Sequence, residues 1–295
     1  MDNIYLESLL RKKVSSARLT SKMDFCFAGG CLTIKVHEEG LKSNMQKDAA
    51  AFEGWAVALK YHLPEEIEKV VINWETPGAF TRQEQLPYNR FLYRLARFTD
   101  TYPWASSAKP IEALPSRLVC NSPDCEAAPA PSQEEAKLEC QVVEEKRNNV
   151  EAIGRQLPVG LFEETVSEST RFTTDGALDI WAVNKDELSI YELKTASNHS
   201  IGIISELMFY AHVVSGLLRH EINYIPSEAL EKSRNQNYRS FGKFYELYEK
   251  QTVRKINAVF LAEQLHPLIT PGLIDFITQS GRFPERGIRF IHETL

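Results

Sequence analysis

Two apolar runs separated by a short polar stretch constrain the fold of this chain more than any other segment. Residues 177–183 read Ala-Leu-Asp-Ile-Trp-Ala-Val, and residues 188–194 read Leu-Ser-Ile-Tyr-Glu-Leu-Lys. The polar stretch between them, residues 184–187, reads Asn-Lys-Asp-Glu. Apolar runs on either side of so short a polar stretch are typical of a β-hairpin. The sequence therefore predicts two antiparallel strands joined by a tight turn.

The register of this hairpin brings three charged residues together. A four-residue loop and a two-residue loop give the same pairing, in which Asp179 lies opposite Glu192. Opposite side chains share a face, with Cβ atoms about 4.5–5.5 Å apart. Alternation along a strand adds Lys194 to the face of Glu192. Because two neighbouring carboxylates repel unless a cation lies between them, this face predicts a site for Mg²⁺, which one or two carboxylates usually hold.

Each of these residues also has a structural interpretation. Asp179 could be a polar residue at a strand end, Lys194 a solvated lysine, and Glu192 its ion-pair partner. However, Asp179 and Glu192 lie within runs that are otherwise apolar, as in buried strands. Acidic residues are almost never fully buried without a partner, and this favours a functional site.

The pattern resembles the core of a known nuclease superfamily. Asp179, followed after twelve residues by Glu192-Leu193-Lys194, is similar to the Asp…Glu-x-Lys core of the PD-(D/E)xK nucleases. Several branches of that superfamily carry Gln-x-x-x-Tyr on the next helix, where this chain has Glu206 and Tyr210. The resemblance covers roughly residues 140–265. It implies an α/β fold with a restriction-endonuclease-like core, in which helices flank a central mixed sheet.

The resemblance also implies a metal-dependent nuclease that hydrolyses phosphodiester bonds, with DNA favoured over RNA. Asp179, Glu192 and the Leu193 carbonyl would hold Mg²⁺, for which Mn²⁺ would substitute. Lys194 would position the attacking water or stabilise charge on the phosphate. The alternative is a catalytically retired nuclease fold that serves as a nucleic-acid-binding or protein-assembly module.

Further site residues are expected on the flanking helices. Glu206 shares a helical face with Tyr210 and apolar residues, so its carboxylate needs a partner, for which Lys194 is the candidate. An ordinary core role for Glu206 and Tyr210 stays open. The superfamily usually adds an acid from the first helix, and Glu151 is the best match. The alternatives for this third acid are Glu144, Glu145, Glu163 and Glu164.

Nucleic acid would need a local basic track, since the net charge is −6. Residues 231–255 interleave cations with aromatic residues, and Arg239 and Lys243 are the candidates there. The alternative is an amphipathic helix whose aromatic side chains face the core. A second candidate is a helical face that carries Arg90, Arg94 and Arg97, which could equally be solvated.

Composition shifts predict the domain organisation. The proline-rich residues 105–135 are expected to form a linker or exposed excursion between an α+β region (1–104) of unknown role and the nuclease-like domain (136–295). Strands are expected at 25–36 (a pair around two glycines), 70–75, 162–172, 255–261 and 288–292. Helices are expected at 47–62, 82–98, 132–157, 200–218 and 271–280.

The remaining expectations concern compartment and assembly. No apolar stretch reaches 18 residues, so no membrane-spanning helix is expected. The acidic N-terminal segment does not resemble a signal peptide. Five scattered cysteines fit reduced thiols in a cytoplasmic protein better than a disulfide framework. The expected partner is nucleic acid, DNA before RNA. Membranes are not expected as partners, and a homodimer is compatible with the sequence.

Overall fold

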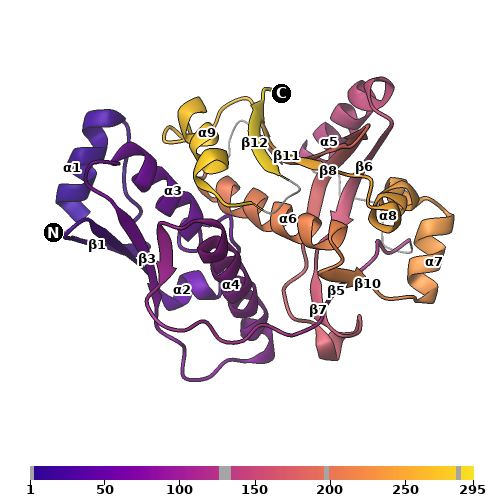
Figure 1. Cartoon of the computed structure of the whole chain (residues 1–295), viewed down its shortest axis with the longest axis horizontal. Coiled ribbons are helices and arrows are strands. Elements are labelled where there is room, and N and C mark those ends of the chain that lie inside the picture. Colours follow the sequence, from indigo (N-terminus) through magenta and orange to yellow (C-terminus); the bar gives the residue numbers. More distant parts are fainter. Residues whose placement is uncertain (1–2, 126–133, 196–198, 284–286) are drawn as a thin grey trace. The chain divides into compact units, whose positions relative to one another are not determined.

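Mixed β-sheets with helices beside them make up this α/β protein (Figure 1). The computed structural model describes residues 3–125, 134–195, 199–283 and 287–295. The chain divides into two compact units, each discontinuous in sequence. The first unit comprises Met1–Leu114, Asn198–Glu206 and Gln264–Phe283, and the second Pro115–Ser197, Leu207–Glu263 and Pro284–Leu295.

A four-stranded sheet with the order β1-β2-β3-β4 forms the first unit. β1 and β2 are the hairpin expected around two glycines, and β2, β3 and β4 run parallel. Gly29 and Gly30 form the turn with φ angles of +54° and +75°, which glycine adopts without a steric cost. The strands are β1 (Met23–Ala28), β2 (Cys31–Val36), β3 (Lys69–Trp74) and β4 (Ala105–Ser107).

Helices of the first unit supply most of its apolar core. They are α1 (Asn3–Lys13), α2 (Glu38–Leu41), α3 (Phe52–His62), α4 (Arg82–Thr101) and α9 (Pro271–Ser280). α3 is buried along nearly its whole length. α4 begins at a capping box in which Thr81 and Glu84 satisfy each other's backbone N–H groups. Hydrogen bonds from Lys42 and then Thr81 lower the pKa of Glu84 to about 2, so this helix start keeps its negative charge in mildly acidic solution, where an ordinary glutamate is protonated.

The second unit contains a five-stranded and a three-stranded sheet in its described residues. In the larger sheet β12, β11 and β9 are parallel, and β8 is antiparallel to both β9 and β6. Its strands in spatial order are β12 (Ile288–Glu293), β11 (Lys255–Ala262), β9 (Glu187–Lys194), β8 (Ala177–Asn184) and β6 (Ala152–Pro158). The smaller sheet has the order β10 (Ile222–Tyr224), β5 (Leu118–Cys120) and β7 (Leu161–Glu163).

Helices α5, α7 and α8 belong to the second unit, whereas α6 passes from the first unit into the second after Glu206. α7 and α8 pack on each other and lie side by side in Figure 1. Their bounds are α5 (Glu134–Lys146), α6 (Gly202–Leu218), α7 (Glu228–Asn235) and α8 (Phe241–Lys250). Short 3₁₀ turns are η1 (Arg147–Asn149), η2 (Glu168–Thr170) and η3 (Tyr238–Ser240).

Different helices pack on the two faces of the five-stranded sheet. α5 packs Val142 and Val143 against Ile180, Ala182 and further apolar residues of one face. Because side chains alternate along a strand, Trp181 points to the opposite face, where it meets Phe244 of α8 at 5.4 Å between ring centroids. Asp179 and Glu192 also belong to this opposite face.

The helix expected at residues 132–157 is wrong in its second half. α5 ends at Lys146, a 3₁₀ turn follows, and residues 152–158 form strand β6. β6 is antiparallel to β8, from the pair Ala152–Val183 to the pair Pro158–Ala177. The strand forms because β8 offers it a ladder of backbone partners, a tertiary effect that a local helical pattern does not contain.

The linker expected at residues 105–135 contains two strands. β4 extends the sheet of the first unit, and β5 is the middle strand of the three-stranded sheet. Residues 126–133 lie outside the described part of the chain. The boundary between the units follows Leu114 rather than residue 104, and the first unit also takes in segments from the expected nuclease-like domain. Strands of three residues are too short to produce a sequence signal.

The strand expected at 162–172 is shorter than predicted. Strand β7 covers only Leu161–Glu163.

Candidate functional site

The hairpin β8–β9 has the predicted register. Antiparallel pairs run from Ile180–Tyr191 to Asn184–Glu187, so the tighter, two-residue turn joins the strands. Lys185 in that turn has a φ of +58°, as the primed hairpin turns require. Asp179 and Glu192 are next in line beyond the Ile180–Tyr191 pair. The predicted pairing is therefore confirmed from the turn as far as the pair Ile180–Tyr191, which is adjacent to Asp179 and Glu192.

Asp179 is held against the neighbouring strand by its own carboxylate. Its Oδ2 accepts a hydrogen bond of 2.9 Å from the backbone N–H of Leu193. Leu193 lies between Glu192 and Lys194 in sequence, so this bond fixes the Asp179 carboxylate beside the Glu-x-Lys segment. Asp179 is only partly buried.

Glu192 and Lys194 form an ion pair inside the protein. Their side chains are only 2% and 6% exposed. In the parallel register with β11, Glu192 pairs with Phe260 and Lys194 with Ala262, so that strand places only apolar residues beside the two charges. A buried ion pair is tolerated when both charges are present, and loss of one partner typically costs about 3–5 kcal/mol. The predicted common face of Glu192 and Lys194 is confirmed.

The prediction of Glu151 as the third acid is wrong. Glu151 is exposed and precedes strand β6 instead of lying on a helix. Its backbone N–H donates to the Val183 carbonyl, near the turn end of β8. Asp179 is four residues further along β8, or about 13 Å at the usual rise of a strand. The alternatives Glu144, Glu145, Glu163 and Glu164 are all exposed.

A different acid of the first helix of this unit, Glu139 on α5, is buried with an exposed fraction of 3%. It accepts a hydrogen bond of 2.8 Å from Gln156 Nε2, and Arg155 Nη1 lies 3.7 Å from its Oε2. Burial raises the pKa of Glu139 against the effect of these partners. Gln156 lies between the pairs Arg155–Ile180 and Leu157–Leu178, the register position opposite Asp179. Its side chain, however, bonds to Glu139 on the face that α5 covers, whereas Asp179 belongs to the other face of the sheet.

Glu139 is not among the residues predicted from the sequence, although the sequence contains a signal for its burial. Glu139 lies three and four residues before Val142 and Val143, on the face of α5 that packs on the sheet. An acid at such a spacing shares the buried stripe of a helix. The incorrect extension of this helix to residue 157 drew attention to Glu151 instead.

Glu206 and Tyr210 are both buried, with exposed fractions of 3% and 4%. The Glu206 carboxylate accepts a hydrogen bond of 2.6 Å from Gln46 Nε2, within the first unit. The ring of Tyr210 contacts the ring of Phe209. The expected roles of Glu206 and Tyr210 in orienting Lys194 and a phosphate remain predictions.

The cationic segment 231–255 separates into a core part and a surface part. Phe241, Phe244 and Tyr248 are buried, so for these aromatic residues the alternative of an amphipathic helix is correct. Lys243 is exposed and pairs with Glu246 at 3.2 Å. The Arg239 guanidinium lies over the ring of Tyr238.

Backbone strain gathers around Arg239. Asn237, Arg239 and Ser240 have φ angles of +47°, +50° and +65°. Non-glycine residues in this region cost of order 1–3 kcal/mol each and cluster at functional sites. Contacts of Arg239 with nucleic acid remain a prediction.

The face with Arg90, Arg94 and Arg97 is not a solvated basic track. Arg90 and Arg94 are 5% and 4% exposed, which contradicts their predicted role in following phosphates. Arg94 Nε donates to Glu53 at 2.8 Å, and its Nη2 donates to the Ala50 carbonyl at 2.8 Å. These arginines lie in the core because α4 buries that face. Arg97 is half-buried, with its guanidinium over the ring of Tyr93.

The described ranges contain no group of three or more His, Cys, Asp and Glu side chains that could hold a metal ion. In the same ranges no helix is long and apolar enough to cross a membrane. Comparisons with protein-family models, curated proteins and solved structures find no match for this chain.

Proposed function

We propose that the chain is a metal-dependent nuclease with a restriction-endonuclease-like core of the PD-(D/E)xK type. The observation that carries this proposal is the Asp179 carboxylate held on the Leu193 amide by a 2.9 Å hydrogen bond, beside the Glu192–Lys194 pair. An acid, a buried acid and a buried amine on one hairpin face are the groups that such chemistry uses. DNA is the favoured substrate, and RNA is the second.

The donor set suits a hard divalent cation. Asp179 and Glu192 would hold Mg²⁺ with the Leu193 carbonyl, and Mn²⁺ would substitute. Two carboxylates with a carbonyl and waters are a common set of ligands for Mg²⁺, so a third protein acid is not required. When bound, the cation would supply Lewis acidity at the scissile phosphate and acidify the attacking water.

The protein's own groups then have separate tasks. The Leu193 N–H orients the Asp179 carboxylate before substrate arrives. The Lys194 ammonium is a donor only, so it would stabilise negative charge on the phosphate or hold the attacking water. Glu139, through Gln156, would position the strand that faces Asp179. Glu206 and Tyr210 would act as orienting groups, and Arg239 and Lys243 would bind the phosphate backbone.

Asp179→Asn is the sharpest test of this proposal. The amide oxygen of Asn can still accept from the Leu193 N–H, so the fold should survive while the charge is lost. We expect cleavage of single- and double-stranded DNA or RNA with Mg²⁺ or Mn²⁺ to fall on the order of 100-fold or more, because several kcal/mol of charge stabilisation disappear. Lys194→Ala is a poorer test, since it leaves the Glu192 carboxylate buried without its ammonium.

Asp186→Asn is the matched control, because it makes the same change in the exposed turn of the same hairpin. It should leave cleavage unchanged, and EDTA should abolish cleavage by the wild type. Full activity of Asp179→Asn would remove Asp179 from the site. A wild-type protein that binds nucleic acid without cleaving it in either metal would instead favour the retired, binding-only module.

A further inference from the structure

Two histidines of the first unit hold the two backbone groups of one buried residue, Leu268. The Leu268 N–H donates to Nδ1 of His266 at 3.2 Å, and Nε2 of His62 lies 2.9 Å from the Leu268 carbonyl. Leu268 is 0% exposed, so water does not replace either bond. Because Leu268 lies in the turn just before α9, the two histidines hold the segment that leads into this helix.

The two bonds differ in what they require of the imidazole ring. The Leu268 N–H can only donate, so Nδ1 of His266 must accept with its lone pair and carry no proton. The Leu268 carbonyl can only accept, so Nε2 of His62 must carry a proton. A second proton on His62 would go to Nδ1 and leave its bond intact. A second proton on His266 would instead occupy the accepting nitrogen, so protonation breaks only the bond of His266.

The surroundings of His266 favour its neutral form. The ring is partly buried and meets the ring of Trp55 on α3, with 6.1 Å between the centroids. Two titratable groups act on it from other segments, Asp48 before α3 and His199 before α6. Burial lowers the pKa of His266, Asp48 partly opposes this effect, and His199 adds to it. The folded protein thus keeps the imidazole in the form that accepts from the Leu268 N–H.

We propose that the hydrogen bond between His266 and Leu268 is an acid-sensitive switch that releases the turn before α9. Once His266 is protonated, the buried Leu268 N–H loses its acceptor, and the turn must open to let water reach it. α9 is coupled to this turn because its first residues are capped by Thr270, which accepts from the Leu273 N–H at 3.2 Å. Opening of the turn therefore loosens the start of α9.

The direction of the pH effect follows from the depressed pKa of His266. A histidine in an open, solvated turn has a pKa of about 6.5. Well above this pH the ring is neutral in both forms, and the closed turn has its full stability. As the pH falls from 6.5 toward the lower pKa of the closed form, the open form binds a proton that the closed form does not. Opening then becomes more favourable by up to about tenfold for each pH unit.

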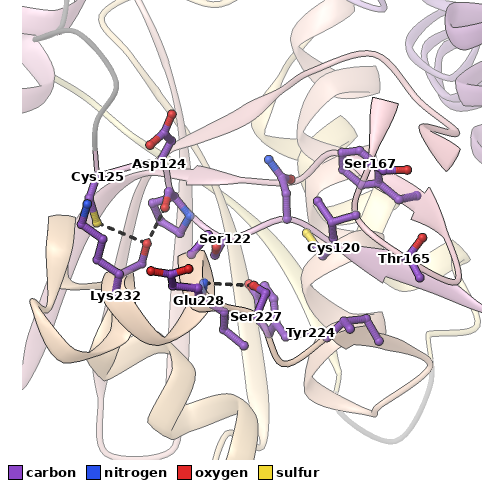
Figure 2. A pocket seen from close by; sticks show the side chains of 18 of the residues that line it. Cys120, Ser122, Asp124, Cys125, Thr165, Ser167, Tyr224, Ser227, Glu228 and Lys232 are labelled. Atoms are coloured by element: carbon purple, nitrogen blue, oxygen red, sulfur yellow. Dashed lines mark hydrogen bonds between the residues drawn. The ribbon is translucent and has the colours of Figure 1, made fainter. Parts of the chain in front are cut away.

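The second unit contains a region that should not respond in this way. A pocket of about 870 Å³ lies around the three-stranded sheet, between residues 120–125, 162–171 and 224–233 (Figure 2). The hydroxyl of Ser233 joins two of these segments by donating to the Pro123 carbonyl. The three segments contain no histidine, the side chain that ordinarily changes its charge between pH 5 and pH 8.

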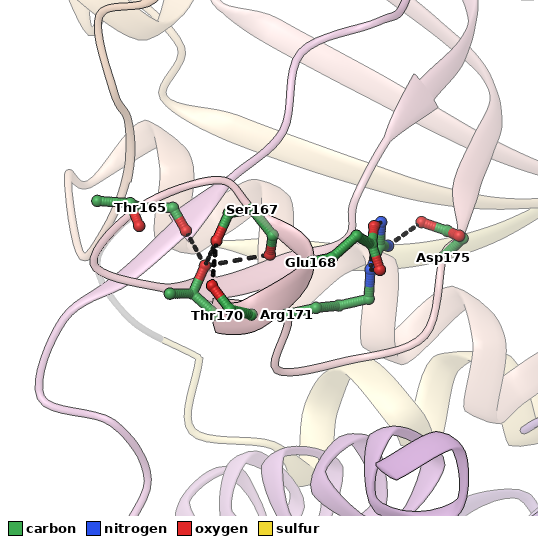
Figure 3. Close-up of polar contacts among 7 residues, drawn as sticks. Thr165, Ser167, Glu168, Thr170, Arg171 and Asp175 are labelled. Atoms are coloured by element: carbon green, nitrogen blue, oxygen red, sulfur yellow. Dashed lines mark hydrogen bonds and ion pairs between the residues drawn. The ribbon is translucent and has the colours of Figure 1, made fainter.

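Segment 165–175, which forms part of this wall, is held by an arginine. Arg171 forms ion pairs with Glu168 and Asp175 (Figure 3). Its guanidinium lies over the ring of Phe162, 4.9 Å from the centroid. The hydrogen bond with Glu168 is the main cause that raises the pKa of Arg171, so this cation keeps its charge throughout the neutral and mildly acidic range. The segment therefore serves as an internal reference.

Hydrogen exchange of the full-length protein, followed by mass spectrometry, compares the wild type with His266→Asn at pH 8 and pH 5. An Asn side-chain oxygen can accept from the N–H two residues further on, as in an Asx turn, and it does not titrate. We expect equal exchange of residues 266–280 in both proteins at pH 8. At pH 5 the wild type should exchange faster there, by up to about tenfold for each unit below pH 6.5. The other histidines titrate in both proteins, so their effects cancel.

His220→Asn is the matched control, because it makes the same substitution in the second unit. It should keep the wild-type exchange of residues 266–280 at both pH values. Segments 165–175 and 224–233 should exchange alike in all three proteins. Equal exchange of the wild type and His266→Asn at pH 5 would overturn the proposal.

NMR of the wild type gives a result that does not depend on any variant. Nδ1 of neutral His266 should show the ¹⁵N shift of an unprotonated ring nitrogen. The amide signal of Leu268 should move along the titration curve of that ring. A protonated Nδ1 at pH 8, or a Leu268 amide signal that does not follow the titration, would also overturn the proposal. Neither experiment bears on metal-dependent cleavage.

Discussion

Charged residues inside this protein are held by specific partners. Glu53 is 2% exposed and receives hydrogen bonds from Arg94 and from Ser205, the latter at 2.8 Å. Glu192 pairs with Lys194 in the same way. The sequence identifies such residues only when an acid interrupts an apolar strand, as Glu192 does. Arg90 and Arg94 were misjudged because a helical face of arginines has the same pattern whether it faces solvent or the core.

The burial of Glu139 leads to a testable prediction about how the stability of the protein depends on pH. Burial raises the folded-state pKa of Glu139 above the ordinary value of a glutamate, so the unfolded chain releases this proton more readily than the folded one. Its stabilising contribution is therefore complete below about pH 4.5 and is lost as pH rises through the folded pKa. Glu139→Gln should match the wild type in stability at pH 4 and exceed it at pH 8, by about 1.4 kcal/mol for each unit of the pKa shift.

Urea unfolding between pH 4 and pH 8 measures this difference. Gln keeps an oxygen that can accept from Gln156 Nε2, so the local hydrogen bond is retained in the variant. Stability curves of the two proteins that stay parallel over this range would show that Glu139 is not perturbed in the folded state.

Among the elements, those with a strong local pattern were predicted and those made by tertiary pairing were not. The register of the hairpin β8–β9 was predicted because two apolar runs and a short turn fix it, and the observed pairs from Ile180–Tyr191 to Asn184–Glu187 follow that register. β6 was not, because residues 152–158 read as a continuation of the preceding helix and become a strand only beside β8. The third acid was misplaced for the same reason, since Glu151 was assigned to a helix that ends at Lys146.

The close packing of Gly154 in strand β6 against the turn η3 leads to a testable prediction. A Cβ there would lie 2.4 Å from the Arg239 carbonyl and 2.6 Å from Trp181 Nε1. A backbone carbonyl cannot rotate away as a side chain can, so η3 would have to move. Gly154→Ala should destabilise the protein by about 1–3 kcal/mol, as overpacking does, and should shift the Tyr238–Ser240 turn.

Thermal unfolding and amide chemical shifts at residues 238–240 measure both effects. Gly78→Ala is the control, because its added Cβ meets nothing within 4 Å, and it should leave stability within about 0.5 kcal/mol of the wild type. Equal stability of the two variants would mean that η3 does not rest on β6 in solution.

At the scale of the whole molecule, neither unit is a continuous stretch of chain. Composition placed a boundary in the proline-rich segment, close to the one after Leu114. It could not show that residues 198–206 and 264–283 return to the first unit. Those returns depend on contacts such as the hydrogen bond of 3.1 Å from the Tyr102 hydroxyl to the Ile277 carbonyl, and contacts of this range leave no periodic signal in sequence.

The fragment 1–114 should therefore not fold alone. It would lack Ser205, which donates to buried Glu53, and α9, which carries the acceptor for Tyr102. Glu53 would keep Arg94 but lose the Ser205 donor, and the Tyr102 hydroxyl would lose its Ile277 acceptor. Each loss costs about 1–3 kcal/mol. We expect no cooperative thermal transition by circular dichroism and no dispersed amide spectrum from the fragment, whereas the full chain should show both. A cooperative transition in the fragment would contradict the assignment of the later segments to this unit.

The return of residues 264–283 to the first unit also has a consequence for synthesis. A growing polypeptide emerges from the ribosome at about 5–20 residues per second, and N-terminal domains usually fold first. Here the segment that ends at Leu114 must wait for another 169 residues (283 − 114) before Phe283, the last residue of its unit, has been translated. During those seconds its apolar surfaces stay open to chaperones and to neighbouring nascent chains. The unit nearer the start of translation is thus complete only once Phe283 has been added, shortly before the second unit receives its own last segment, Pro284–Leu295. A chaperone bound to residues 1–114 would protect the first unit during that interval.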